Sequence, residues 1–282
     1  MTIVSVVSDL HLEFDGLTLP GGDILLLCGD TFVASRLAEF RNDAESRAQK
    51  KRYRKFCAEE LKKYWRVLAI AGNHEFYGGV VPDELALVRD LFSEFAPHAQ
   101  LLDNEYVEID GVRFIGSTLW APYGCDTADH LFIQDGMNDF SRIEIAREDD
   151  LSGFKTHKFR VADANGLHQE SVAFLKHAVN CELPCVVMTH HAPTFLAINR
   201  KRFPDGRFDD AYASNQTEFI LDNPQIKIAC HGHSHYRYRA KIGETKVFAN
   251  PRGYYGHERM SLGFDASECD FSLETFEFVD AQ

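Results

Sequence analysis

Short, unbroken runs of apolar residues recur along the chain and predict strands that are covered on both faces. They occupy residues 3–7, 24–28, 67–71, 185–189 and 226–230. A strand with one exposed face alternates apolar and polar residues, whereas a continuous run of this length is typical of a strand buried on both faces. We therefore expect a sheet core that other elements cover from both sides.

Other segments have helical periodicity. Residues 37–64 are charged and carry apolar residues at roughly helical spacing, and residues 167–179 have the pattern of an amphipathic helix. A further helix is predicted to begin at Pro82, a residue favoured in the first turn of a helix. Its apolar face would consist of Leu85, Val88, Leu91, Phe92 and Phe95.

Two hairpins and a closing strand complete the pattern. Asp110-Gly111 separates residues 106–109 from 112–115, and Gly243-Glu244 separates residues 236–242 from 245–249. Such turn residues between apolar segments predict β-hairpins. Residues 271–279 alternate and predict a last strand. Strands, helices and hairpins together indicate an α/β (α+β) fold with mixed sheets.

The length of 282 residues suits one large domain or two small ones, and we interpret residues 1–282 as a single domain. Residues 120–165 are polar and weakly patterned, so we interpret them as an insertion or lid that shapes substrate choice. The possible pocket walls in this stretch are Tyr123, Phe132, Asn138, Asp139 and Phe140.

Composition narrows the function and the compartment. The net charge of −13 argues against stable nucleic-acid binding, although metal ions could supply local positive charge for a small phosphorylated substrate. Seven scattered cysteines without a C-x-x-C motif suit a reducing compartment. No stretch approaches the roughly 20 apolar residues of a membrane span, and no signal peptide precedes the first strand. We expect a cytoplasmic protein without membrane attachment; its oligomeric state is open.

Potential metal ligands follow all five of the buried runs. Two carboxylates, one amide and four imidazoles are a donor set that suits two divalent cations sharing a bridge. The seven residues are Asp9, His11, Asp30, Asn73, His190, His233 and His235.

The carboxylates come first along the chain. Asp9 and His11 are two residues apart, so in an extended segment both side chains would point toward one cation. The alternative is a capping aspartate beside a surface histidine. Asp30 follows Gly29, which permits a tight turn that exposes the carboxylate as a bridge. The alternative is an ordinary turn aspartate.

The segment Gly72-Asn73-His74-Glu75 is more specific. The Asn73 amide oxygen is a workable hard ligand, and His74 beside it could contact the substrate instead of a metal. We expect Glu75 to hold that imidazole in its charged form. An asparagine-driven turn with a solvated histidine is the alternative.

Histidines dominate the later motifs. In the doublet His190-His191 we choose His190 as the ligand because it leaves the strand first. His191 would then support it or have a structural role. His233 and His235 repeat the spacing of two residues after a strand. For His231 a role in packing or in support of a ligand is the more natural interpretation.

These blocks, in this order, resemble the calcineurin-like metallophosphoesterases. D-x-H, G-D, G-N-H-E, H and G-H-x-H are all intact, and the resemblance extends from residue 3 to about residue 255. Residues 137–140, 189–193 and 250–254 also resemble a bacterial subset of that family. The resemblance implies a four-layer α-β-β-α sandwich with two central mixed β-sheets and a site at their strand ends.

The resemblance also implies a role for each ligand. One metal would be surrounded by Asp9, His11, Asp30 and His235, and the other by Asp30, Asn73, His190 and His233, with Asp30 as the bridge. His74 would contact the phosphoryl group and protonate the leaving oxygen. The Asp-Arg-Gly that Ser/Thr protein phosphatases of the family carry shortly after Gly-Asp is absent here, which argues against protein-phosphatase activity.

We therefore expect a dinuclear metal-dependent phosphoesterase. A hydroxide bridging two cations about 3.5–4 Å apart would attack phosphorus in line. The substrate would be a phosphodiester or a small phosphomonoester, and Arg252 would border its pocket. Manganese is favoured, but Fe, Zn, Ni or Mg also suit these donors. The alternatives are a scaffold or binding protein on a phosphatase fold and a metal hydrolase that acts on non-phosphate substrates.

Overall fold

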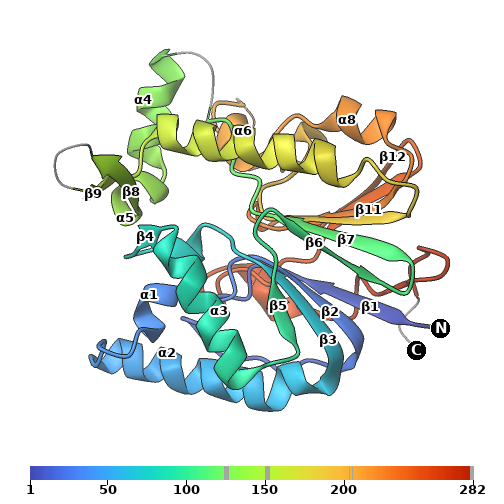
Figure 1. Cartoon of the computed structure of the whole chain (residues 1–282), viewed down its shortest axis with the longest axis horizontal. Helices are drawn as coiled ribbons and strands as arrows, with labels where there is room; N and C mark the ends of the chain where they lie inside the picture. The colour runs from blue at the N-terminus through green and yellow to red at the C-terminus, as the bar shows by residue number, and fades with distance from the viewer. Residues whose placement is uncertain (124–126, 150–152, 203, 205, 280–282) are drawn as a thin grey trace.

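The computed structural model describes residues 1–123, 127–149, 153–202, 204 and 206–279, and two β-sheets form its centre (Figure 1). The first sheet comprises β1 (Ile3–Val7), β2 (Gly22–Cys28), β3 (Tyr64–Ile70), β5 (Ala99–Leu101) and β14 (Phe271–Ser272). Its order is β14-β1-β2-β3-β5, in which only β14 is antiparallel to its neighbour.

The second sheet is also mixed. It comprises β6 (Glu105–Ile109), β7 (Val112–Ser117), β10 (Cys185–Thr189), β11 (Ile226–His231), β12 (Tyr238–Ile242) and β13 (Thr245–Ala249). Its order is β12-β13-β11-β10-β7-β6. The four inner strands are parallel, and the edge strands β6 and β12 close the two predicted hairpins in antiparallel pairing.

Strand β2 shows why the apolar runs are unbroken. Ile24 and Leu26 pack between the two sheets, whereas Leu25 and Leu27 pack against the helices outside the first sheet. Because both faces of the sheet are covered, both sets of alternating positions must be apolar.

Helices cover the outer face of each sheet and complete four layers (Figure 1). Those on the first sheet are α1 (Ala34–Leu37), α2 (Ala44–Lys55) and α3 (Asp83–Phe95), and those on the second are α6 (Val161–Ala178) and α8 (Thr217–Asp222). Tyr53 and Phe92 bury their rings against the first sheet, and Leu175 packs against the second. The predicted α-β-β-α sandwich is confirmed.

Residues 120–165 contain regular elements of their own. They include α4 (Thr127–Gly136), α5 (Asp139–Arg142), β8 (Glu144–Asp149) and β9 (Gly153–Lys158), and β8 pairs with β9 and with β4 (Val80–Val81) in a third sheet. These elements stand at one end of the molecule (Figure 1). Trp120, Phe140 and Phe159 share one apolar cluster with Phe76, so the segment is packed onto the main body. Its role in substrate choice stays a prediction.

Two predicted elements differ from the structure. Residues 37–64 do not form one helix, because α1 ends at Leu37 and α2 begins only after Asp43, which caps it by accepting the N–H of Ser46. A π-helical turn (Phe56–Glu60) and a 3-10 turn (Leu61–Lys63) then lead into β3. Residues 271–279 pair with β1 over two positions only. The chain turns at Phe276, whose φ is +57°, and Phe278 pairs back onto Phe271.

Four short elements remain. They are η3 (His74–Phe76), η4 (Phe195–Ala197), α7 (Asp209–Tyr212) and η5 (Arg259–Gly263). Within the described ranges, no helix combines the length and the apolar character that a membrane crossing requires.

Candidate metal centre

The seven predicted ligands follow the carboxyl ends of five parallel strands, three in the first sheet and two in the second. At the carboxyl edge of parallel strands the loops converge, which places their side chains together. A direct bond joins the two halves: the backbone N–H of His233 donates to Asp9 Oδ1 at 2.8 Å. Asp9, His11 and His190 are fully buried, and Asp30 and Asn73 are nearly so.

Most of these residues have an unusual backbone conformation. Positive φ values occur at five of them: Asp9 (52°), His11 (47°), Asp30 (53°), His233 (65°) and His235 (43°). A left-handed conformation is uncommon outside glycine, although Asp and His tolerate it better than most residues, and such strain concentrates at functional sites. The extended geometry that we expected for the first two residues is therefore wrong: left-handed turns, rather than strand alternation, bring their side chains together.

Glycines leave room for this crowding. Gly29 has a φ of +85°, and a Cβ atom there would collide with the His190 ring. A Cβ atom on Gly72 would overlap the Asp30 carboxylate and approach the Asp30 backbone nitrogen to 2.6 Å. The two glycines are required because side chains of the centre occupy the space that any larger residue would need.

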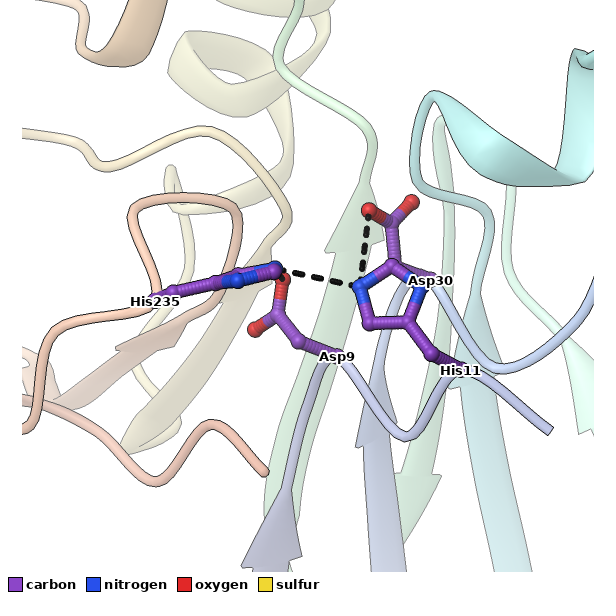
Figure 2. Close-up of side chains that lie close together, drawn as sticks. All are labelled: Asp9, His11, Asp30 and His235. Atoms are coloured by element: carbon purple, nitrogen blue, oxygen red, sulfur yellow. Dashed lines mark hydrogen bonds and ion pairs between the residues drawn. The ribbon is translucent and has the colours of Figure 1, made fainter. Parts of the chain in front are cut away.

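One group of ligand atoms gathers around the loop after β1 (Figure 2). It consists of Asp9, His11, Asp30 and His235, whose donor atoms all lie within 4.8 Å of one another. His11 Nε2 is 3.0 Å from His235 Nε2 and 3.8 Å from Asp30 Oδ2. His235 Nε2 lies 3.4 Å from Asp9 Oδ1.

A second group shares Asp30 with the first. Asp30, His190 and His233 also offer atoms within 4.8 Å of one another. Asn73 Oδ1 lies 3.0 Å from His190 Nε2 and 3.2 Å from His233 Nδ1, because its amide nitrogen donates to Asp139 Oδ1 at 2.7 Å and is thereby turned away. The structure therefore brings all seven predicted ligands together in two adjoining groups.

Each of the four imidazoles makes its outer hydrogen bond with the surrounding protein. Carboxylates accept from two of them: Glu13 Oε1 from His11 at 3.0 Å and Glu258 Oε2 from His235 at 2.5 Å. Backbone carbonyls accept from the other two: that of Cys28 from His190 at 2.9 Å and that of Ala211 from His233 at 3.2 Å. An oxygen acceptor can hold a proton on the outer nitrogen, so the inner nitrogen can offer its lone pair when a cation is bound. Neutral imidazoles with inward lone pairs are the form that binds metal ions.

The two carboxylates keep their charge despite burial. Burial alone would raise the pKa of Asp9, but the hydrogen bond and charge of His235, together with the charge of His190, lower that pKa to about 2. Burial also opposes the charge of Asp30, yet His190 foremost holds its pKa well below the usual value. Asp9 Oδ2 has no hydrogen-bond partner in the described part of the chain. Buried carboxylates with an unused oxygen and convergent lone pairs fit a pair of divalent cations.

His74 lies at the edge of this centre. Its Nε2 is 3.9 Å from Asp30 Oδ2 and 3.2 Å from the hydroxyl oxygen of Tyr254, and its ring stacks on Tyr77 with centroids 4.1 Å apart. Burial lowers the pKa of His74, but the charges of Asp30 and Glu13 outweigh burial and raise it. The residue thus contacts the centre without being needed to complete either group.

The Glu75 carboxylate does not contact the His74 ring, so our expectation for this pair is wrong. The 3-10 turn that starts at His74 directs the Glu75 carboxylate into the protein, where it accepts the backbone N–H groups of Gly72, Asp30, Thr31 and Phe32 at 2.6, 2.9, 2.7 and 3.2 Å. Burial and the charge of Asp30 raise its pKa to about 7. Glu75 ties together the loops after β2 and β3.

The carboxylate that contacts His74 belongs to Glu13. Glu13 Oε1 lies 3.1 Å from His74 Nδ1 and 3.0 Å from His11 Nδ1. The sequence reasoning missed this residue, although its position two residues after His11 extends the D-x-H spacing by one further step. Glu258, the acceptor of His235, was also missed, and no spacing in the sequence points to it.

Arg252 is likewise corrected. Its guanidinium is buried and donates to the carbonyl oxygens of Leu10, Asp15 and Gly16 at 3.0, 2.9 and 2.8 Å, so it supports the loop after β1 instead of bordering a pocket. Tyr254, two residues later, is the member of this turn that faces the centre. The loop carbonyls lack strand partners and need these donors.

The two remaining histidines lie outside the two groups. His191 is fully buried behind His233, with ring centroids 4.1 Å apart, and burial holds its pKa well below the usual value. That position is compatible with the supporting role we expected. His231 is also fully buried, and burial lowers its pKa to about 4.

A cavity of about 120 Å³ opens onto the centre. The walls outside the ligands and His74 include Tyr77, Tyr212, Tyr254, Met137, Asn138 and Arg202. Of the five walls that we expected from residues 120–165, Asn138 is present. Tyr123 and Phe140 lie in the core, Phe132 is partly exposed elsewhere, and Asp139 is buried against Asn73 and Tyr77.

Known proteins share this sequence pattern and fold. The model of the calcineurin-like phosphoesterase family matches residues 4–237. "Uncharacterized protein L509" of Acanthamoeba polyphaga mimivirus is 28% identical over 280 residues, which cover 93% of this chain and 94% of that protein. The phosphopantetheinyl hydrolase of Mycobacterium tuberculosis is similar in fold, with a TM-score of 0.54, 14% sequence identity and 89% of each chain covered. Because the family model spans most of its length, the chain belongs to the calcineurin-like phosphoesterase family and is, in general terms, a metal-dependent phosphoesterase.

Proposed function

We propose that this protein is a dinuclear enzyme that hydrolyses phosphodiesters or small phosphomonoesters. The observation that carries the proposal is the orientation of Asp30. Its Oδ2 faces His11 Nε2 at 3.8 Å, and its Oδ1 faces His190 Nε2 at 3.3 Å. One carboxylate therefore serves both groups of donor atoms, as a bridge between two cations must.

The remaining donors complete two sites. Asp9, His11 and His235 would hold one cation with Asp30, and Asn73, His190 and His233 would hold the other. When bound, two divalent cations supply Lewis-acid chemistry that activates water and neutralises the phosphoryl charge. Manganese is the favoured identity, and Fe, Zn, Ni and Mg are the alternatives that these donors accept.

His74 would act on the leaving group. Its Nδ1 faces Glu13 and its Nε2 faces the cavity, so the proton on Nε2 can hydrogen-bond to a phosphoryl oxygen and then be transferred to the departing oxygen. The raised pKa of His74 favours the protonated ring that a general acid requires. Tyr254 contacts the same nitrogen and fixes its direction.

The cavity supports a small reacting group. A volume of about 120 Å³ between three tyrosines and Arg202 suits a phosphoryl group with a modest substituent, and a larger substituent would extend outward past Arg202. The net charge of −13 argues against a long polyanionic substrate such as a nucleic acid.

Metal removal tests the proposal. We expect the purified protein to hydrolyse bis(4-nitrophenyl) phosphate or 4-nitrophenyl phosphate, and dialysis against a strong chelator to reduce the rate to background. Addition of Mn²⁺ should restore it, with metal content measured in every sample. Full activity in the metal-free protein would contradict the mechanism. A folded protein that binds metal but hydrolyses no phosphate ester in a broad panel would favour a scaffold role.

A further inference from the structure

One carboxylate in this molecule is shared by two imidazoles with different tasks. Glu13 Oε1 accepts from His11 Nδ1 and from His74 Nδ1, at 3.0 and 3.1 Å. The two rings approach edge to face, with centroids 4.5 Å apart and planes 70° apart. His11 belongs to the first donor group, whereas His74 lies outside both groups and faces the cavity.

The shared contact determines which nitrogen of each ring faces inward. With Nδ1 of His11 protonated toward Glu13, Nε2 keeps a lone pair that points at Asp30 and His235. With Nδ1 of His74 protonated toward the same oxygen, a second proton on Nε2 points toward the cavity and Tyr254. The same acceptor thus serves a ring that must be neutral and a ring that must be able to carry an additional proton.

The position of Glu13 is set independently of these two rings. Arg252 donates to the carbonyls of Leu10, Asp15 and Gly16, and Arg52 donates to those of Leu12 and Glu13 itself. Two guanidinium groups therefore hold the backbone of the loop from residue 10 to residue 16, at Glu13 itself and at positions before and after it. Its side chain is only 10% exposed, so water does not compete freely for the carboxylate.

We propose that Glu13 is a positioning residue that couples the metal centre to the general acid, by fixing His11 as a ligand and His74 as a proton donor through one oxygen atom. This inference rests on the proposed function. In this chain the carboxylate partner of His74 comes from the loop after β1.

Glu258 provides a matched control. Glu258 Oε2 accepts from His235 Nδ1 at 2.5 Å, as Glu13 does from His11, but the structure gives it no contact with His74. Glu13→Gln and Glu258→Gln should each lower metal affinity by about 10–100-fold, the usual effect of losing a partner of a ligand histidine. At saturating Mn²⁺, Glu258→Gln should recover most of its kcat. Glu13→Gln should remain about 100-fold or more below wild type, with a larger deficit for an alkyl ester than for a nitrophenyl ester.

Combination with His74→Ala tests the coupling. In the His74→Ala background at saturating metal, Glu13→Gln should reduce kcat by a few fold at most. The reason is that His74, the second ring that Glu13 positions, is already absent. Thermal unfolding and the far-ultraviolet spectrum identify any variant that fails to fold, and Glu13→Asp, which retains the charge on a shorter arm, should recover part of the loss. Equal recovery of Glu13→Gln and Glu258→Gln at saturating metal would overturn the proposal.

A measurement without metal or substrate separates this inference from the proposed function. In the chelated protein, nitrogen chemical shifts should show that the rings of His11 and His74 carry a proton on Nδ1, and Glu13→Gln should change both rings while leaving His190 unchanged. If the wild-type protein hydrolyses no phosphate ester but these shifts behave as described, the phosphoesterase proposal fails and the positioning role of Glu13 stands. If the shifts of either ring are unaffected, the positioning role fails whatever the activity.

Discussion

Asp30 is the residue on which the two donor groups depend. Its two oxygens face different groups, and its backbone carbonyl and N–H are held by His11 N and Glu75 Oε2. His235, by contrast, contributes to one group only. The loss of charge at Asp30 should therefore affect both cations at once.

Asp30→Asn should lower metal content and kcat more than His235→Ala does. An amide offers one oxygen and no charge, so it cannot balance two cations. Metal analysis and kcat measured on the same samples check this. A variant that retains both metals and a normal rate would show that Asp30 is no bridge.

His74 should separate chemistry from metal binding. The donor groups are complete without it, so His74→Ala should keep both metals while kcat falls by about 10²–10⁴. The loss should be smaller for a nitrophenolate leaving group, which needs less protonation. Equal losses for good and poor leaving groups would reduce the role of His74 to electrostatic stabilisation, and loss of a metal would make it a ligand.

Which residues gather at the centre could be predicted from residue types and spacing, but their hydrogen-bond partners could not. Chain proximity suggested Glu75 as the partner of His74, yet a 3-10 turn sends the two side chains in different directions. The partner is Glu13, 61 residues away in the sequence. Such pairs depend on how two loops meet, and a single sequence contains no distance between loops.

Among the elements, α6 carries a glycine without structural need. A Cβ atom on Gly166 would meet no atom within 4 Å, and the helical backbone there suits alanine. Gly166→Ala should raise the free energy of unfolding by about 1 kcal/mol in urea titrations and leave kcat unchanged. Gly72→Ala is the contrasting substitution, because the added Cβ atom would overlap the Asp30 carboxylate. This variant should bind metal more weakly. A lower free energy of unfolding for Gly166→Ala would show that a side chain at this position of α6 does collide with neighbouring atoms.

The loop after β1 depends on Arg252. Removal of its side chain leaves the carbonyls of Leu10, Asp15 and Gly16 without their donor. Arg252→Ala should lower the free energy of unfolding by about 2–4 kcal/mol, the range for a disrupted buried hydrogen-bond network, and should lower kcat through Glu13. Chemical denaturation and steady-state kinetics report the two effects. Unchanged stability with a raised KM would instead show that Arg252 borders the substrate pocket.

Buried strands were the most predictable elements because coverage on both faces leaves an unbroken apolar run, as in β2 and β10. A segment whose turn is not marked by glycine was not predictable. Residues 271–279 alternate as a strand would, but the left-handed turn at Phe276 folds the segment back onto itself. Residues 120–165 looked like a weakly patterned lid because their apolar residues follow no fixed period. These residues pack against one another and against η3.

At the scale of the whole molecule, the donor groups span both sheets. Asp9, His11, Asp30 and Asn73 follow strands of the first sheet, while His190, His233 and His235 follow strands of the second. Neither sheet alone could assemble either group. The centre exists only when the sandwich is closed.

Cations held across that junction would therefore bind the folded chain and have no comparable site on the unfolded one, in which Asp9 and His233 are separated by 224 residues. By mass action, free metal at one hundred times its dissociation constant adds about 2.7 kcal/mol to stability for each site. The midpoint of unfolding would then follow the metal concentration of the medium. In a cell, metal scarcity would lower the amount of folded protein as well as its activity, so supply of the ion would govern abundance.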